Sequence, residues 1–357
     1  KTELLDRKLE LDEIEERKSA ALEISKGLKE VKVIEERKVD KPMQDFMTPD
    51  DARASAEYRS AFLKALQGKP LTDIEKRANE MASTDVAGVI PTLTQERIFD
   101  KLKYYAPLLN EITLLQVPGN VTFAVESTNN AAALHSQNTA VTPAADTMTS
   151  VTLAGYEIIK VLRISATVSA MSINAFEGWL VDYLAKGIAA KIGAYIIYGT
   201  GSSQPKGIDY MDTWTDTTNA VQWAGTSPTT GELVETVSYL KAGYHMGAKW
   251  LMNSKTFWAR VAAVQDNSKY KILTDDYKRL LGYEILLDDN VADDDIFFGN
   301  FREGIVGNLS QNIKVDRSMD SGFLNNAIDY RGTAIFDCDL THTEGFIKSA
   351  PALTAGA

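Results

Sequence analysis

The sequence has little cysteine, little histidine and no long apolar run. Cys338 is the only cysteine among 357 residues, so no internal disulfide can form. No apolar run reaches the ~18–20 residues that a membrane helix needs, and Lys1 to Glu10 are too charged for a secretory signal. We therefore exclude a small disulfide scaffold and expect no membrane association and a cytosolic place of synthesis. The first residue is a lysine, which leaves the natural start of the protein open.

Basic residues are fewer than acidic ones: the sequence has 38 Lys and Arg and 49 Asp and Glu, which gives a net charge of −11. A protein that reads duplex DNA usually carries a basic domain or stripe. The sequence has neither, so we expect no specific recognition of nucleic acid. With 44% hydrophobic residues, the chain can form one large or two ordinary domains with real cores.

Charge density changes abruptly near residue 80. Of the first 80 residues 36 are charged, against 51 of the remaining 277. Apolar residues in the charged segment follow a weak heptad pattern: Leu4, Leu11, Ile14, Ala21 and Leu28. A second amphipathic helix is expected from Asp51 to Leu66, and Thr72 can cap one more short helix. Residues 1–80 are therefore predicted to be a helical domain, either a solvated extension or a self-association module.

The next segment predicts an arm followed by a long hairpin. Residues 86–91 turn into an extended arm, and Thr94 to Leu102 indicates a short helix. Alternation then places Val121, Phe123 and Val125 on one face of a strand, with Val151, Leu153 and Gly155 on a matching return strand. An isolated two-stranded hairpin is marginal in water. We expect this one to lie on the body of the protein or on a neighbouring subunit.

The strongest helix signal runs from Met171 to Tyr198, which would be roughly 40 Å long. Its apolar residues recur every three or four positions: Ile173, Phe176, Leu180, Leu184, Ile188, Ile192 and Tyr195. Gly199-Thr200-Gly201 is expected to end it. The rest indicates an α+β fold, with helices over Glu232–Met246 and Ser254–Val264 and with strands over Lys249–Asn253, Leu281–Leu286, Asp295–Gly299, Asn312–Val315, Ala327–Tyr330 and Ala334–Phe336.

No pattern in the sequence predicts catalysis, a cofactor or a metal. Gly199 to Gln204 begins like a dinucleotide-binding loop, but the last glycine is replaced by Gln204 and the segment follows a helix. No P-loop and no Gly-x-Ser-x-Gly elbow is present. Three isolated histidines have no metal-ligand spacing and are expected to be ordinary surface or core residues: His135, His245 and His342.

A lone cysteine and an acidic cluster can each be interpreted either as structural or as a chemical site. Cys338 lies in an apolar late strand and is expected to be a small core residue rather than a nucleophile. An acidic cluster could hold a divalent cation but lacks the glycine and spacing of a calcium loop, so we expect a solvated turn: Asp288, Asp289, Asp293, Asp294 and Asp295.

The order of the parts points to one family. The helix end Tyr198–Gly201 followed by Gln204-Pro205-Lys206-Gly207-Ile208 looks like a G-x-G…P-x-G-[IL] turn. Other matching segments are Gly88–Pro91, Trp250–Asn253 before a helix near Thr256, Leu281–Ile285, Phe298–Phe301, and Phe323–Asn326 with Arg331. In these features, across residues 85–350, the chain resembles the major capsid proteins of tailed bacteriophages, which have the Hong Kong 97 fold. The first 80 residues match only by type.

The resemblance implies a division into five parts. Residues 1–80 would be a helical, charged scaffolding (delta-like) domain, 81–115 an N-terminal arm and 116–157 an extended hairpin loop. Residues 158–224 and 326–357 would form a peripheral domain with the spine helix, and 225–325 an axial domain.

The resemblance also implies a function. The protein would be a major capsid protein, not an enzyme, that assembles as pentamers and hexamers into an icosahedral shell around the double-stranded DNA of a tailed phage. A portal, a maturation protease and non-specifically packaged DNA would be partners, with no membrane and no cofactor. It would assemble in the bacterial cytoplasm and reside in the virion capsid.

Some relatives join neighbouring subunits through a lysine on the hairpin, an asparagine on a neighbour and a buried acid. No Lys or Arg lies between Lys103 and Lys160, and Thr333 stands where the acid would be. We therefore predict no such crosslink, although Asn326 falls at the asparagine position.

Three further questions stay open. The charge step between Arg77 and Gly88 is interpreted as a proteolytic junction. An encapsulin-type nanocompartment shell is similar in fold but normally lacks an 80-residue charged N-terminal domain. A coiled-coil-tethered α/β enzyme is the remote alternative, disfavoured by the lack of a convergent acid, base, nucleophile or phosphate loop.

Overall fold

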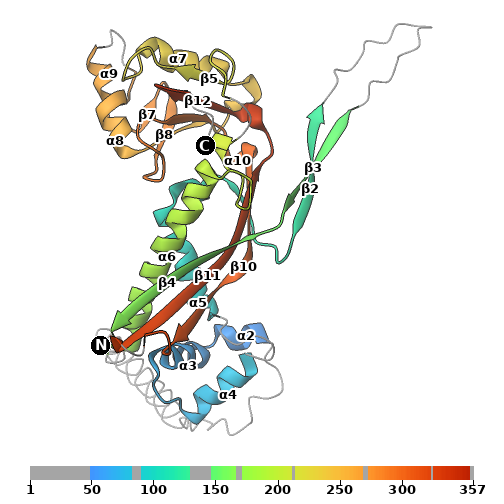
Figure 1. The fold of residues 1–357 in the computed structure, drawn as a ribbon, viewed down its shortest axis with the longest axis vertical. Helices are drawn as coiled ribbons and strands as arrows, with labels where there is room; N and C mark the ends of the chain where they lie inside the picture. Colours follow the sequence, from blue (N-terminus) through green and yellow to red (C-terminus); the bar gives the residue numbers. More distant parts are fainter. Residues whose placement is uncertain are drawn as a thin grey trace, which may run out of the picture. The chain divides into compact units, whose positions relative to one another are not determined.

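A computed structural model describes residues 49–82, 90–128, 146–165, 171–210, 214–267, 272–322 and 325–353. These residues form an α+β fold with a four-stranded, a six-stranded and a two-stranded sheet (Figure 1). The chain divides between Thr48 and Pro49, and the larger compact unit is Pro49–Ala357. The heptad positions from Leu4 to Leu28 lie outside the described residues.

Helix α6 (Ile173–Tyr198) confirms the predicted long helix. It begins at Ser172, whose Oγ accepts a hydrogen bond from the Ala175 amide, as an N-cap serine does. The predicted stripe is buried from Phe176 to Ile192, and the burial extends to Val181, Ala185, Ala189 and Ile197. The helix is therefore surrounded on more than one side by the described core.

Glycine is required where α6 ends. A Cβ on Gly199 would lie 2.2 Å from the Pro205 carbonyl oxygen, and one on Gly207 would lie 2.6 Å from the Gly199 nitrogen. The Gly207 amide donates to the Gly199 carbonyl at 2.8 Å. Only glycine permits this approach of two backbone segments, which gives the sequence motif its physical reason.

The four-stranded sheet packs against α6 and against α5 (Thr92–Tyr105), followed by the 3₁₀ turn η1 (Pro107–Asn110). Its order is β1 (Thr113–Leu115), β10 (Ile305–Ser318), β11 (Ala327–Leu340) and β4 (Tyr156–Ser165). β1 is parallel to β10, and the other pairs are antiparallel. The strands expected at 312–315, 327–330 and 334–336 are confirmed, but each is part of a 14-residue strand.

The six-stranded sheet has the order β5 (Ala220–Gln222), β12 (Phe346–Ala350), β9 (Ile296–Gly299), β6 (Lys249–Met252), β8 (Tyr283–Leu287) and β7 (Arg279–Leu280). Its core contains Trp250 and Phe298, whose ring centroids are 4.5 Å apart. Helix α7 (Thr230–Tyr239) packs on β5 and β12 of this sheet. The other short helices of the described chain after α6 are α8 (Ser254–Thr256), α9 (Ala262–Asn267) and α10 (Phe301–Gly304), with 3₁₀ turns η3 (Ile208–Tyr210), η4 (Ala242–Tyr244) and η7 (Thr343–Gly345).

Three predicted elements differ from the structure. The helix expected over 232–246 ends at Tyr239, because Leu240 is extended (φ −69°, ψ 131°) and buried in the core. The strand expected from Leu281 starts at Tyr283, because Leu281 and Gly282 have positive φ and make a tight hairpin turn. The helix expected over 254–264 contains a π-helical turn, η5 (Phe257–Val261).

The C-terminal part of the segment expected to be domain 1–80 packs with the rest of the described chain. Helices α2 (Pro49–Ala54), α3 (Ala56–Gln67) and α4 (Asp73–Ala82) belong to the larger unit. Phe62, Leu63 and Leu66 enter the core beside α6, and the Tyr330 hydroxyl donates to the Leu66 carbonyl at 2.9 Å. Helix α3 therefore has an apolar, buried face although the segment around it is highly charged.

Local signals in this segment are partly confirmed. The single helix expected over 51–66 is broken at Ser55. The Ser55 Oγ accepts a hydrogen bond from the Tyr58 amide, so Ser55 is the N-cap of α3. Thr72 caps α4 as predicted, with its Oγ accepting from the Glu75 amide at 3.4 Å. Serine and threonine compete with the helical backbone in this way.

The strands of the two larger sheets come from both sides of the expected boundary between peripheral and axial domains. β10, expected in the axial segment 225–325, pairs with β11 beside α6. β12 and β5, expected in the peripheral segments, belong to the six-stranded sheet. The reason is strand pairing: the chain crosses between the sheets at 300–305 and again at 340–346.

Candidate assembly site

The predicted hairpin is formed by β2 (Val121–Thr128) and β3 (Thr147–Leu153). Phe123 pairs with Val151 and Val121 with Leu153, so the expected faces are confirmed. The hydroxyls of Thr122 and Thr152 lie 2.9 Å apart on the other face. Residues 129–145, which connect the strands, lie outside the described residues.

Two side chains of the four-stranded sheet fix the base of this hairpin. Asn308 on β10 accepts from the Val117 amide at 3.1 Å and donates to the Val117 carbonyl at 3.1 Å. Asp337 on β11 accepts from the amides of Ala154 and Gly155 at 2.8 and 3.1 Å. Burial raises the pKa of Asp337, and these backbone hydrogen bonds oppose that rise.

Beyond its base the hairpin is exposed on one face and at most half-buried on the other. Residues 147–150 of β3 are all exposed, and Met148 retains 74% of its accessible surface. On β2, Val121, Phe123 and Val125 are only half-buried. A two-stranded ribbon without a covered face is not independently stable, so this surface is a candidate for contact with another molecule.

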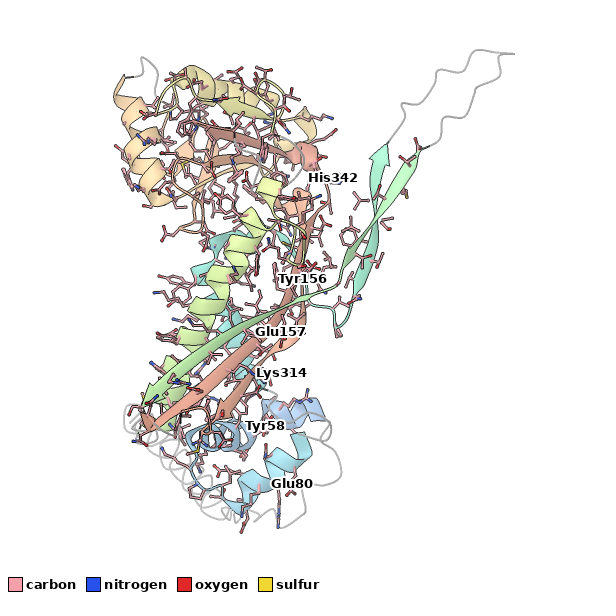
Figure 2. The ribbon with its side chains drawn as sticks, in the orientation of Figure 1. Tyr58, Glu80, Tyr156, Glu157, Lys314 and His342 are labelled. Atoms are coloured by element: carbon pink, nitrogen blue, oxygen red, sulfur yellow. The ribbon has the colours of Figure 1, made fainter. Side chains whose placement is uncertain are left out.

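The neighbouring strand β4 offers a second candidate surface. It is at the edge of the four-stranded sheet, and Tyr156 and Glu157 mark where it leaves the hairpin (Figure 2). Ile159 and Val161, on the side opposite the buried Ile158 and Leu162, are about half exposed. An exposed apolar edge is a template for pairing with another chain.

A buried carboxylate holds the N-terminal helices to α6. The Glu177 side chain is fully buried and accepts from Thr94 Oγ at 2.6 Å, from Arg97 Nη1 at 3.2 Å and from Arg59. Burial alone would raise the pKa of Glu177, but Arg59, Thr94 and Arg97 together hold it below its usual value. Three helices, α3, α5 and α6, therefore meet at one ion cluster.

Sequence reasoning missed Glu177, Asn308 and Asp337. A signal existed for Glu177, which interrupts the apolar pattern of α6 between Phe176 and Leu180. A charge at such a position predicts a buried partner. No comparable signal marks Asn308, because its role depends on where β10 passes the hairpin.

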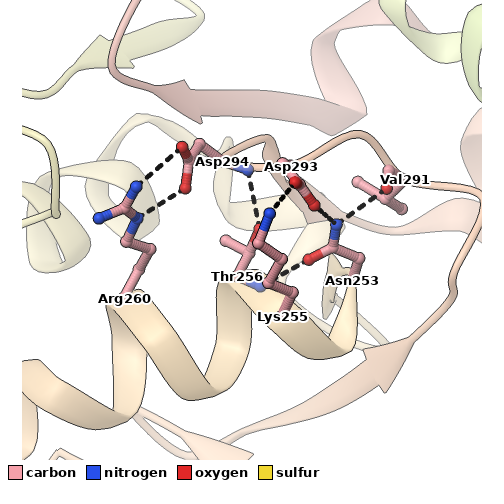
Figure 3. A network of polar contacts seen from close by, with 7 residues as sticks. All are labelled: Asn253, Lys255, Thr256, Arg260, Val291, Asp293 and Asp294. Atoms are coloured by element: carbon pink, nitrogen blue, oxygen red, sulfur yellow. Dashed lines mark hydrogen bonds and ion pairs between the residues drawn. The ribbon is translucent and has the colours of Figure 1, made fainter.

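The acidic cluster is a network of ion pairs, and the expected solvated turn is only partly correct. Asp294 receives two hydrogen bonds from Arg260, at 2.7 and 3.1 Å (Figure 3). Asp293 pairs with Lys255 and accepts from Asn253 Nδ2 at 2.8 Å. Asp288 is buried, and Asp295 faces the interior.

These pairs join α8 and η5 to the loop before β9. Asn253 also caps α8, and Thr256 Oγ accepts from the Asp294 amide at 2.8 Å. Among the described residues no group of three or more His, Cys, Asp or Glu side chains is arranged to hold a metal ion.

The other candidates have structural contacts. Cys338 is buried on β11, which confirms it as a core residue, and burial raises the pKa of its thiol well above the usual value. Both ring nitrogens of His245 contact protein oxygens, at 2.8 and 3.1 Å. The His342 ring packs at a tilt against Tyr244, with the ring centroids 6.0 Å apart. His135 lies outside the described residues.

Asn326 and Thr333 both lie on or beside β11. Asn326 is exposed and has a left-handed backbone (φ 48°) just before the strand, whereas Thr333 is buried within it. Neither observation tests the predicted absence of a crosslink, which stays a prediction. No helix among the described residues is long and apolar enough to cross a membrane.

Comparison with known proteins identifies the chain's relatives. The model of the phage capsid family matches residues 87–350. The chain belongs to the phage capsid family. No curated protein matches its sequence.

Solved capsid structures share the fold of this phage capsid family member. The capsid of a native GTA particle is 19% identical, with a TM-score of 0.58 over 76% of this chain and 94% of that chain. The capsid of an empty GTA particle gives a TM-score of 0.57, with 19% identity, over 69% and 96%. A protein of the Mycobacterium phage Adephagia gives 0.52, with 15% identity, over 70% and 91%.

The predicted α+β, Hong Kong 97-like fold is therefore confirmed, and the protein is a major capsid protein that forms the virion shell. The family match begins at residue 87 and so excludes α2–α4, although α2 contacts α5 and α3 contacts α6 within the matched residues.

Proposed function

We propose that this capsid protein builds a closed icosahedral shell of pentamers and hexamers, and that its hairpin lies across a neighbouring subunit. The observation that carries the proposal is the β2–β3 hairpin, which is held at its base by Asn308 and Asp337 and is exposed beyond it. A head-to-tail contact closes into rings when its rotation permits. An arm on every copy multiplies weak contacts into a stable cage.

Residues 1–48 are proposed as the built-in scaffold. The larger compact unit begins at Pro49, and α3 is fixed to α6 through Arg59 and Glu177. A cut between Arg77 and Gly88, as the charge step suggested, would remove this contact once the N-terminal fragment left the subunit. We therefore place removal by a maturation protease before Pro49, and mass spectrometry of DNA-filled particles decides it. Particles whose first residue lies beyond Arg77 would contradict this placement.

The work of the subunit is proposed to be geometric, without turnover of a substrate. Its partners would be further copies of itself, a portal, a maturation protease and DNA packaged without sequence recognition. Assembly would take place in the bacterial cytoplasm. A container for DNA needs no basic reading surface, so the net charge of −11 is compatible with this role.

Cryo-electron microscopy of particles assembled from the full chain tests the proposal. We expect five- and six-membered rings, with β2 and β3 lying on an adjacent subunit. Rings in which the hairpin folds back on its own subunit would contradict the proposed contact. On a denaturing gel the particles should give monomer-sized protein, because the hairpin has no lysine to donate.

A further inference from the structure

Lys348 is a lysine in the interior of the six-stranded sheet. It retains 2% of its accessible surface, and every residue of its strand β12 is buried. Its ammonium nitrogen lies 2.6 Å from Asp209 Oδ1 and 3.5 Å from Asp295 Oδ1. Lysine is almost never fully buried unless paired, and here it faces two acids from different parts of the chain.

Both acids are held in place by donors. Trp214 Nε1 donates to the same Asp209 Oδ1 at 2.9 Å. The Tyr198 hydroxyl donates to Asp295 Oδ2 at 2.9 Å and accepts from the Ala292 amide at 2.8 Å. Two carboxyl groups, one amine and an N–H donor therefore meet at one point.

Water is largely excluded from this cluster. The Lys348 nitrogen is 5.5 Å from the centroid of the Phe297 ring, and Trp214 packs on Phe297 with ring centroids 6.2 Å apart. Burial is the main cause that raises the pKa of Asp295, opposed by the charge of Lys348. In such surroundings a proton passes readily from an ammonium group to a carboxylate, because the neutral pair avoids the desolvation of two charges.

We propose that Lys348 and Asp209 join in an amide bond that forms within the subunit without an external enzyme. The amine is the nucleophile, the Asp209 carboxyl carbon is the electrophile and Asp295 is the proton carrier. The nitrogen already contacts Oδ1, which is one bond from that carbon, so the reacting groups are close to an attack geometry.

The step balances without a co-reactant. A proton moves from the Lys348 ammonium to the Asp209 carboxylate, which gives an amine and a carboxylic acid. The nitrogen then bonds to the carboxyl carbon, and Oδ1 carries the developing charge against Trp214 Nε1–H. Asp295 accepts the proton of the attacking nitrogen and returns it to the departing hydroxyl. One water leaves, one C–N bond forms, and nothing is oxidised or reduced.

The bond would link two segments that are 139 positions apart in the sequence. Asp209 lies in η3, just after the glycine turn that ends α6, and Lys348 lies in β12. Everything between them, including most of the six-stranded sheet, would be enclosed in a covalent loop. Closing a loop of this length restricts the unfolded chain, as a disulfide does.

Mass spectrometry of the denatured full chain tests the proposal. We expect a mass lower than that of the sequence by one water. Trypsin cannot cut after an acylated lysine, so the peptide 207–241 should remain joined to the peptide that begins at Gly332. A free tryptic peptide that ends at Lys348, from a chain of full mass, would overturn the proposal.

Variants separate the bond from a simple ion pair. Asp295→Asn removes the proton carrier but keeps the volume, and should give the unbridged mass. Asp209→Asn should lose one ammonia instead of one water. Lys249, 2.9 Å from Glu111 on the partly exposed side of β6, is a matched internal control and should be cleaved normally. The mass of the wild-type chain alone shows whether the amide bond has formed, so a variant that fails to fold does not affect the test. The mass measurement also does not depend on whether the chain assembles into shells.

Discussion

At the scale of residues, the stability of the subunit depends on charges that the fold has taken out of water. Glu177 is the clearest case, because it is fully buried and receives hydrogen bonds from three side chains. Such a group stabilises the fold only while its partners stay, and it is strongly destabilising once they leave. Arg59 contributes two of these hydrogen bonds and Arg97 contributes one.

Arg59→Ala should therefore lower the free energy of unfolding by about 2–3 kcal/mol, the value of hydrogen bonds to a buried charge. Arg97→Ala is the matched control, because the Arg97 side chain is more exposed and should contribute less than about 1 kcal/mol. Urea unfolding of the unassembled subunit measures both. Equal losses for the two variants would contradict the assigned role of Arg59.

Acid should weaken the N-terminal helices. Lys64, with the Thr72 amide and Ser60, lowers the pKa of Glu75 from 4.5 to about 2. A lowered pKa means that the ionised group stabilises the fold above its unfolded value, and that this stability is lost as pH falls from 4.5 towards 2. Hydrogen exchange of α3 and α4 should rise over this range, and Glu75→Gln should flatten the dependence. If hydrogen exchange of the Glu75→Gln variant depended on pH as in the unchanged protein, the assigned role of Glu75 would be contradicted.

Residue-scale prediction from the sequence succeeded where the signal is local. Thr72 was expected to cap a short helix, and it caps α4. It failed where the partner is distant. In the sequence, Lys348 is a single basic residue in a short apolar segment. Its contacts with Asp209 and Asp295 could not be predicted, because they depend on the fold.

At the scale of elements, the hairpin is the part whose position the sheet controls most directly. Asn308 and Asp337 bind backbone atoms on either side of the β2–β3 ribbon, so they set the direction in which it leaves the body. Period-two alternation predicted the strands and their facing pairs. The anchors could not be predicted, because they follow from the passage of β10 and β11 beside the hairpin.

Asp337→Asn should leave the fold largely intact and lower the association constant for assembly by on the order of tenfold, since one strong hydrogen bond is worth about that factor. Asp339→Asn is the matched control on the same strand, because within the described part of the chain Asp339 accepts a hydrogen bond only from the adjacent Leu340 amide. Light scattering of assembly reactions measures the difference. Equal assembly by both variants would refute the anchoring role.

The N-terminal helices give the second prediction at this scale. A chain of residues 49–357 should keep the thermal stability of the full chain. A chain of residues 83–357 should be destabilised by at least about 4 kcal/mol, because it loses three buried apolar side chains and the Arg59 contact: Phe62, Leu63 and Leu66. Calorimetry of the two fragments compares them. Equal stability of the two fragments would support a domain boundary near residue 80, as the charge pattern suggested.

At the scale of the whole molecule, the fold is that of a shell subunit with two packed sheets, a long helix and a projecting ribbon. Periodicity in the sequence predicted the hairpin, the long helix and a mixed α and β remainder, and the resemblance to capsid proteins implied how these parts form one fold. The expected domain limits stay a prediction, and β10 and β12 pair with strands from the other side of those limits. Strand pairing over long sequence separations leaves no local mark in the sequence.

The central claim is that this protein acts by assembling with copies of itself. Analytical ultracentrifugation of the purified full chain under assembly conditions tests it most directly. We expect a megadalton species that disappears when the hairpin is deleted and the subunit remains folded. A chain that sediments as a monomer, dimer or trimer under every such condition would contradict the account.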